Sequence, residues 1–137
     1  MDRDVVDGLS QHKTDQCNDM HSACGPLHDP ILQGDRWLET WIPRLEASDA
    51  YQRGGAILIT WDEAQATDDC PGADCPIGLI VLSPLAKGGG FASSLAYDHS
   101  SMLKSLQRIF GLSPLLGAAA GRRVNDLADL FTTFPSP

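Results

Sequence analysis

The sequence has little positive charge, few aromatic residues and no long apolar run. Its 137 residues hold 10 Lys and Arg against 18 Asp and Glu, the pI is near 4.7, and aromatic residues make up 7%. Contacts with phosphate backbones need Lys and Arg, so a nucleic acid is not expected as the main partner. The longest apolar run, Gly78–Leu82, has only the length of a strand, and no transmembrane segment is expected.

A basic start followed by an apolar stretch is also absent from Met1–Asp7, so no signal peptide is expected in this chain. If Met1 is the natural start, the protein is expected in the cytoplasm. The composition, 42% hydrophobic and 20% charged, is that of a globular protein. The length predicts one small domain or part of a larger one.

The negative charge is concentrated in the first half. Residues 1–76 contain 15 acidic and 5 basic residues, whereas residues 77–137 contain 3 acidic and 5 basic residues. The first half also contains three of the four histidines and all four cysteines. Most of these carboxylates are expected on a solvated surface, and a few are candidates for binding a cation.

The four cysteines, Cys17, Cys24, Cys70 and Cys75, lack the spacing of a zinc knuckle. A Pro-Gly turn lies between the second two, so their side chains can meet easily. An even count in two local pairs favours Cys17–Cys24 and Cys70–Cys75 disulfides in an oxidising compartment. The alternative is four reduced thiols in a cytosolic protein.

Residues 1–34 are polar and without a sustained period, and they are predicted to be loop-rich. Residues 35–134 are predicted to form a helix-strand-strand-helix core. Apolar residues recur at helical spacing in 35–50, with Asp35 as the expected N-cap and Pro43 as a bend. Two apolar runs, 56–60 and 77–82, are predicted strands buried on both faces. A helix over 100–110 ending at Gly111, and a short one near 125–131, complete the core.

This order of elements predicts an α/β layered fold. Two strands alone make a poor sheet, which suggests that the chain is one part of something larger. In open α/β sheets, ligands bind outside the carboxyl ends of the strands.

Asp62 and Glu63 follow directly on the first predicted strand. Adjacent carboxylates at such a point are costly unless they are solvated or bind a cation, and hard divalent cations prefer oxygen ligands. His99 begins the 100–110 helix, where the helix dipole disfavours an imidazolium. A neutral imidazole there can bind a metal or donate to a phosphate oxygen, although it can also be an ordinary residue of a helix start.

Asp19 and His21 place a second carboxylate and a second imidazole in an early loop. Such a pair can supply two ligands, but most isolated examples are structural. His12 and His28 have no comparable setting and are predicted to be surface residues.

Taken together, segments spread along most of the chain resemble one known family. They are Gly34–Leu38, Ile42–Pro43, Ser48, Gly55–Glu63, Leu82–Pro84, Tyr97–Lys104, Phe110–Leu112 and Asp126–Phe131. Their order resembles the C-terminal part of the phosphoesterase family within the alkaline phosphatase superfamily. That family includes bacterial and fungal acid phosphatases, phosphatidylinositol-3-phosphatase-like enzymes and phospholipases C, and its members are secreted or periplasmic.

The resemblance implies a partial three-layer α/β/α sandwich around a mostly parallel sheet. It also implies metal-assisted cleavage of phosphate esters, either small molecules or phospholipid head groups. Asp62 and Glu63 fall on the family's metal-binding carboxylate pair, and the divalent cation is unidentified. His99 and, less closely, His21 fall on histidines expected to act catalytically by holding phosphoryl oxygens or a second cation.

Two features of the family pattern are missing from this sequence. Family members carry a Glu-Asn-x-Ser-Phe-Asp-like motif on their first strand, and the Ser or Thr nucleophile follows in the same half. Neither has a counterpart here, and Ser100 and Ser101 are expected to cap a helix. Residues 1–137 are therefore expected to be the C-terminal part of one phosphoesterase domain.

Three functions remain open at this stage. The chain can belong to an acid phosphatase-like phosphomonoesterase, to a phospholipase C-like phosphodiesterase, or to a catalytically inactive remnant that only binds a metal or a partner. An incomplete domain should expose a sheet edge and apolar surface, so self-association is expected.

Overall fold

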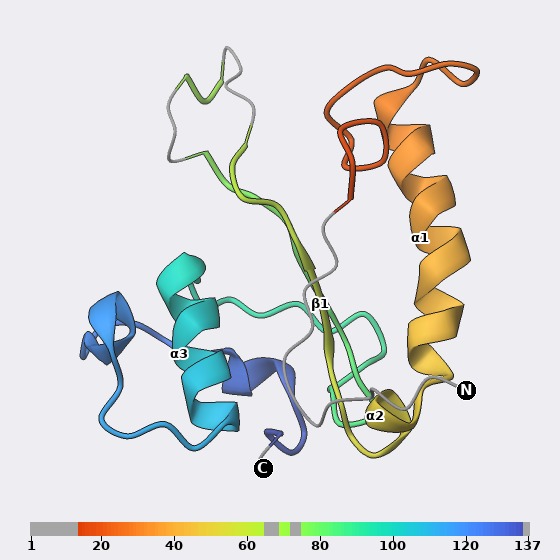
Figure 1. Cartoon of the computed structure of the whole chain (residues 1–137). Helices are drawn as coiled ribbons and strands as arrows, with labels where there is room; N and C mark the ends of the chain where they lie inside the picture. Colours follow the sequence, from red (N-terminus) through yellow and green to blue (C-terminus); the bar gives the residue numbers. More distant parts are fainter. Residues whose placement is uncertain (1–13, 65–68, 72–74, 136–137) are drawn as a thin grey trace. The chain divides into compact units, whose positions relative to one another are not determined.

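A computed structural model describes residues 14–64, 69–71 and 75–135 (Figure 1). The chain divides into two compact units, Met1–Arg53 and Gly54–Pro137. The first contains helices α1 (Pro30–Glu46) and α2 (Asp49–Gln52). The second contains strands β1 (Ile57–Thr60) and β2 (Leu79–Leu82), helix α3 (His99–Ile109) and the 3-10 turns η1 (Gly117–Ala120) and η2 (Leu127–Leu130). None of the helices in the described part of the chain is long and apolar enough to span a bilayer.

Helix α1 begins earlier than the periodicity predicts. Its N-cap is Asp29, whose carboxylate accepts a hydrogen bond from the Leu32 amide at 3.0 Å, and Pro30 occupies the first turn. The prediction of Asp35 as the N-cap is therefore wrong, because an Asp-Pro pair is a stronger start signal than an acidic residue within the helix. The helix continues through Pro43 and ends three residues later, so residues 49–52 form the separate helix α2.

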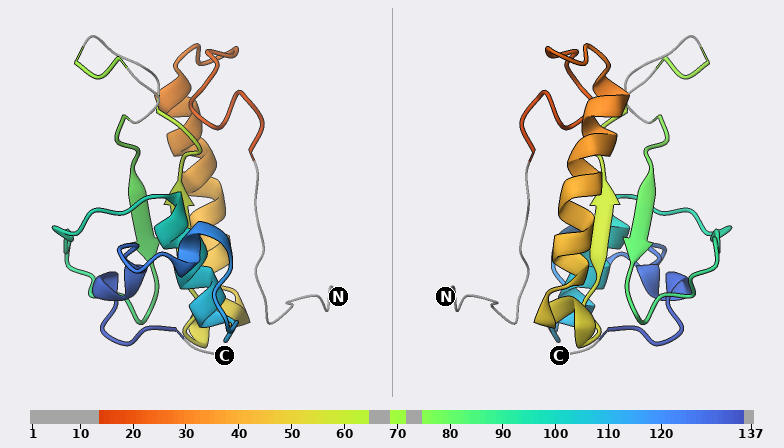
Figure 2. Two further views of the ribbon diagram at one scale, coloured as in Figure 1. Left: turned by 90° about the vertical axis from the view of Figure 1, so that its left-hand side faces the viewer. Right: turned by 90° about the vertical axis from the view of Figure 1, so that its right-hand side faces the viewer.

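The two strands confirm a mixed α/β chain, but they pair antiparallel rather than parallel (Figure 2). Ile57 lies opposite Leu82, and Thr60 lies opposite Leu79. A parallel pair needs a crossover connection, usually a helix, and the described residues between β1 and β2 contain none. The second strand therefore returns along the first, and the prediction of a mostly parallel sheet is wrong for this pair.

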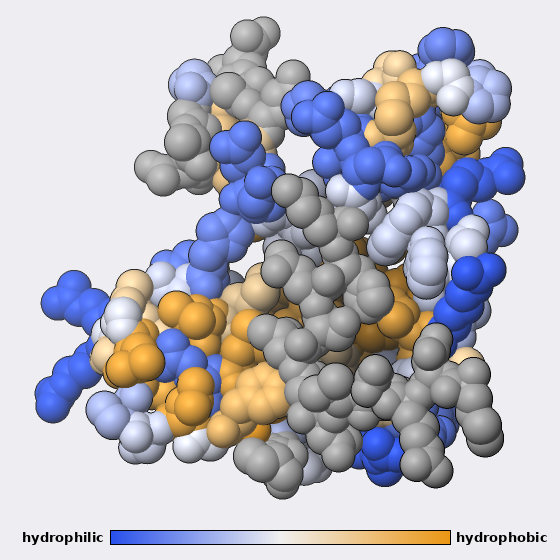
Figure 3. All heavy atoms as spheres, in the orientation of Figure 1, coloured by the Kyte–Doolittle hydropathy of each residue, from blue (hydrophilic) through white to orange (hydrophobic). Residues whose placement is uncertain are grey.

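The strands are also less buried than predicted. The residues of β1 are only half-buried, and Ile80 in β2 keeps 48% of its surface exposed. A continuous apolar run is typical of a strand that is covered on both faces. The covering has to come from other segments, and the described residues leave both strands partly exposed. Large apolar residues are exposed elsewhere too, among them Leu95, Leu103 and Phe110, and apolar side chains gather around α3 on the face shown in Figure 3.

The small core of the second unit lies under α3. Ala119, Leu127 and Phe131 are buried there, together with Ser105 of the helix. The Ser105 hydroxyl donates to the Ser101 carbonyl and accepts from the Leu127 amide, both at 2.8 Å. No buried polar side-chain atom among the described residues lacks a partner, so the polar groups beneath α3 join it to η2.

Candidate functional site

The end of β1 and the start of α3 meet in the second unit. Asp98 is the N-cap of α3 and forms a capping box with Ser101, which places His99 at the first helical position. The His99 Nε2 atom lies 2.7 Å from the backbone carbonyl oxygen of Asp62, just beyond β1. A carbonyl only accepts, so the imidazole donates this bond and carries its hydrogen on Nε2. In the neutral ring, Nδ1 is then left as an acceptor.

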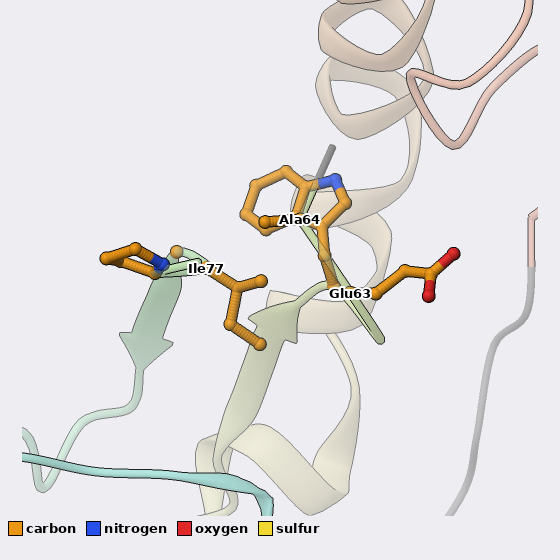
Figure 4. A pocket seen from close by; sticks show the side chains of 6 residues that line it. Glu63, Ala64 and Ile77 are labelled. Atoms are coloured by element: carbon orange, nitrogen blue, oxygen red, sulfur yellow. The ribbon is translucent and has the colours of Figure 1, made fainter. Parts of the chain in front are cut away.

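Both adjacent carboxylates are exposed at this point. The Asp62 carboxylate accepts a hydrogen bond from the Glu63 amide at 3.0 Å, which fixes one of its oxygen atoms close to the backbone. Glu63 borders an open hollow of about 410 Å³ formed with Trp61 and Ile77. In Figure 4 its carboxylate points away from Ile77 into the surroundings. The carboxylates are therefore accessible to a ligand.

A close approach between the strand ends shapes the wall of this hollow. The Trp61 ring lies over Gly78, where a Cβ atom would be 2.8 Å from ring atom Cζ3. The Thr60 hydroxyl donates to the Gly78 carbonyl at 2.9 Å. Glycine at position 78 is thus required by packing, because any side chain would displace the ring.

Among the described residues there is no group of three or more His, Cys, Asp or Glu side chains that could hold a metal ion. Carboxylate oxygens are suitable ligands for Mg²⁺, Ca²⁺ or Mn²⁺, but these ions take about six or more ligands. Asp62 and Glu63 fit such a cation in donor type and supply only part of its coordination shell.

A scan against family models identifies the class of chemistry. The model of the Phosphoesterase family matches residues 9–113, which include Asp62, Glu63 and His99. The chain belongs to the phosphoesterase family. Searches of curated proteins and of solved structures found no match. The family indicates hydrolysis of phosphoesters and a phosphate ester as the substrate.

His21, the second histidine that is expected to contact phosphate in this phosphoesterase chain, lies in the first unit. It is exposed, its Nδ1 atom is 3.0 Å from the Ser22 hydroxyl, and its amide donates to the Asp19 carboxylate at 2.9 Å. His99, Asp62 and Glu63 all lie in the second unit. His28 is exposed, as predicted, and His12 lies outside the described residues.

His21 is carried by a loop that a disulfide closes. Cys17 and Cys24 are bonded, as are Cys70 and Cys75, which confirms the pairing favoured by the spacing. The buried Gln33 of α1 joins this loop to the helix: its amide donates to the carbonyls of Cys17 and Ser22 and accepts from the Cys24 amide. Sequence reasoning missed Gln33, since one polar residue in an amphipathic helix gives no signal of its contacts.

Sequence reasoning also missed a second group of residues. We call it the Asp129 cluster, and it consists of Lys87, Ser93, Tyr97 and Asp129. The Ser93 hydroxyl donates to Asp129 at 2.7 Å and lies 3.1 Å from the Tyr97 hydroxyl. Lys87 donates to the other Asp129 oxygen at 3.1 Å. These hydrogen bonds, that of Ser93 first and that of Lys87 next, lower the pKa of Asp129. The cluster joins residues up to 42 positions apart, which no local pattern reveals.

Proposed function

We propose that this chain forms the C-terminal part of a metal-dependent phosphoester hydrolase of the acid phosphatase-like, phosphomonoesterase type. The observation that carries the proposal is the contact between His99 and the Asp62 carbonyl, which joins an imidazole to the backbone of the segment that carries two exposed carboxylates. Family membership supports phosphoester chemistry in general.

In this proposal Asp62 and Glu63 hold a divalent cation together with ligands from outside the described residues. A bound cation would polarise the phosphoryl group and neutralise charge that develops on it. The His99 Nε2 hydrogen is donated to the backbone, so the neutral ring would have no hydrogen for a phosphoryl oxygen. The ring would have to be protonated to donate from Nδ1 to that oxygen. His21 is proposed as the second histidine that contacts phosphate.

The nucleophile is proposed to come from another segment. Ser101 is 2% exposed and is engaged with Asp98, and the Ser93 hydroxyl donates to Asp129. The buried Ser101 hydroxyl is not available for attack on phosphorus, and the Ser93 hydroxyl is held in the Asp129 cluster. We therefore propose that residues 1–137 are one part of a larger phosphoesterase domain, in which the β1–β2 pair extends a larger sheet of a three-layer sandwich.

The two disulfides favour an oxidising compartment, because such bonds persist mainly in secreted, periplasmic or surface proteins. We propose a secreted or periplasmic location for the complete protein.

Calorimetric titration with Mg²⁺, Mn²⁺, Ca²⁺ and Zn²⁺ tests the cation site directly. The chain should bind at least one of these ions, and the double variant Asp62→Asn, Glu63→Gln should bind it at least about tenfold more weakly. Glu39→Gln, which changes an exposed carboxylate in the first unit, is the matched control and should bind as the wild type does. Absence of binding to all four ions would favour an inactive remnant, and equal binding by the double variant would remove Asp62 and Glu63 from the site.

A further inference from the structure

A second hollow, the α3 hollow, lies beside His99 between the strands and α3, with a volume of about 230 Å³. Most of its wall is apolar, and Leu127 forms a fully buried part of it, whereas Leu95 is 45% exposed. The apolar residues that line it are Ile77, Leu79, Leu95, Met102 and Leu127. The four polar residues that line it decide what it can bind.

Two of the polar residues are occupied by local structure. The Thr60 hydroxyl gives its hydrogen to the Gly78 carbonyl. The Asp98 carboxylate accepts from the amide and the hydroxyl of Ser101, at 2.8 and 3.2 Å. Thr60 has no hydrogen left to donate to a ligand. Both bonds to Asp98 end on its Oδ1 atom, so this carboxylate can still accept a hydrogen bond through Oδ2 but has none to donate.

The Asp129 cluster determines the state of Tyr97. Asp129 is an ionised carboxylate, flanked by Lys87, and it only accepts, so Ser93 uses its one hydrogen in that bond. The 3.1 Å contact between Ser93 and Tyr97 then requires the Tyr97 hydroxyl to be the donor. Its hydrogen is committed to Ser93, and Tyr97 offers the α3 hollow mainly its ring.

Asp98 can only accept hydrogen bonds, and the hydroxyl hydrogens of Thr60 and Tyr97 are committed. His99 is therefore the lining residue that could donate to an anionic group. Its Nε2 hydrogen is donated to the Asp62 carbonyl, and Nδ1 makes no hydrogen bond among the described residues. The α3 hollow thus combines a mostly apolar wall with the Asp98 carboxylate and the His99 imidazole. With the ring protonated, Nδ1 would donate, and such a site suits a molecule with an apolar body and one anionic group attached to it.

Volume limits the size of that body. An apolar cavity of about 150 Å³ accommodates benzene, and pockets for drug-sized ligands begin near 300 Å³. At about 230 Å³, the α3 hollow can enclose one substituted ring, and a larger ligand would extend out of it.

We propose that the α3 hollow binds the alcohol part of the substrate and selects phosphomonoesters of a single-ring, apolar alcohol, with the phosphoryl group held at His99. The part of this inference that places the phosphoryl group at His99 rests on the proposed function. Binding of the ring in the α3 hollow can be tested separately.

The test compares phenyl phosphate with methyl phosphate, which carry the same charged group and differ in the apolar body. Binding to the whole chain is followed by NMR of ¹³C-methyl methionine, in the presence of any divalent cation found to bind. Met102 lines the α3 hollow and reports on it, and Met20, which packs against Gly34 in the first unit, is the internal control. Met102→Leu assigns the signal.

Phenyl phosphate should bind about tenfold or more tightly than methyl phosphate and shift Met102 but not Met20. Leu95→Ala should reduce this ratio by about threefold or more, whereas Leu116→Ala, which trims an apolar side chain that is 61% exposed and outside the hollow, should leave it unchanged. His99→Gln should weaken both esters alike and preserve the ratio.

Equal affinities for the two esters would overturn the inference and leave the proposed function standing. If neither ester binds, the proposal of phosphate binding at His99 is wrong. Titration with phenol, which has the ring without the phosphate, then tests ring binding in the α3 hollow. A Met102 shift with phenol that Leu95→Ala weakens would support an apolar ring site, and no shift would overturn it.

Discussion

The His99 imidazole donates a 2.7 Å hydrogen bond to the Asp62 carbonyl, across 37 positions of sequence. The bond joins the first residue of α3 to the chain just after β1. It fixes the ring tautomer and thereby decides which nitrogen can contact a ligand.

Replacing His99 should loosen this connection. We expect His99→Phe to reduce the free energy of unfolding by about 1 kcal/mol, because the Asp62 carbonyl loses its donor. Nitrogen-15 NMR of the wild-type ring should show hydrogen on Nε2. His28→Asn, at an exposed histidine with a positive φ of 52° that Asn tolerates, is the control. A neutral ring protonated only on Nδ1 would contradict the assigned tautomer.

Adding a methyl group at Gly78 should displace the Trp61 ring, since the new Cβ atom would lie 2.8 Å from it. Gly78→Ala is expected to cost about 1–3 kcal/mol of unfolding free energy, as overpacking usually does. In a Trp61→Leu background the same change should cost less, because the ring is gone. Denaturant unfolding of the four proteins measures this difference, and equal costs would show that the ring is not the obstacle.

Removing the Gln33 side chain should destabilise the first unit. Gln33→Ala leaves the Cys24 amide and the carbonyls of Cys17 and Ser22 without their partner, at a cost of about 1–3 kcal/mol. Gln16→Ala, at an exposed glutamine, is the matched control and should cost less than about 0.5 kcal/mol. Thermal unfolding followed by circular dichroism compares them. If the two variants lost the same amount of stability, Gln33 would not be the residue that holds the loop to α1.

Acid should weaken the Asp129 cluster. Because the pKa of Asp129 is lowered in the folded chain, its contribution to stability is present above the carboxyl's ordinary value and is lost as the pH falls through the lowered value. Ser93→Ala removes the larger cause and should raise the pKa of Asp129 toward its ordinary range. Carbon-13 NMR of the carboxyl group measures this shift, and an unchanged titration in the variant would contradict it. Ser94→Ala is the control, since Ser94 is the exposed neighbour of Ser93.

The isolated chain is expected to self-associate through the edges of the two-stranded sheet. Ile80→Lys places a charge on β2, where Ile80 is 48% exposed, and should shift the chain toward monomer in sedimentation velocity. Leu116→Lys adds the same charge away from the sheet and should have a smaller effect. A wild-type chain that remains monomeric at high concentration would contradict this prediction.

Local features of this protein follow from the sequence because they depend on neighbouring residues. Short spacing brings each pair of cysteines together, Gly111 supplies the positive φ of 65° that ends α3, and apolar runs form both strands. The Asp-Pro pair that starts α1 was also present in the sequence, although helical periodicity drew attention to Asp35 instead.

The tertiary structure alone decided how distant segments meet. It determined that β2 runs antiparallel to β1, that His99 turns Nε2 to Asp62, and that Ser93 bridges Tyr97 and Asp129. Such contacts depend on where the chain folds back, and the partners are separated by intervals that carry no periodic signal. The sequence therefore determined which residues are proposed for phosphoester chemistry, and folding decided which of their atoms are already engaged in hydrogen bonds.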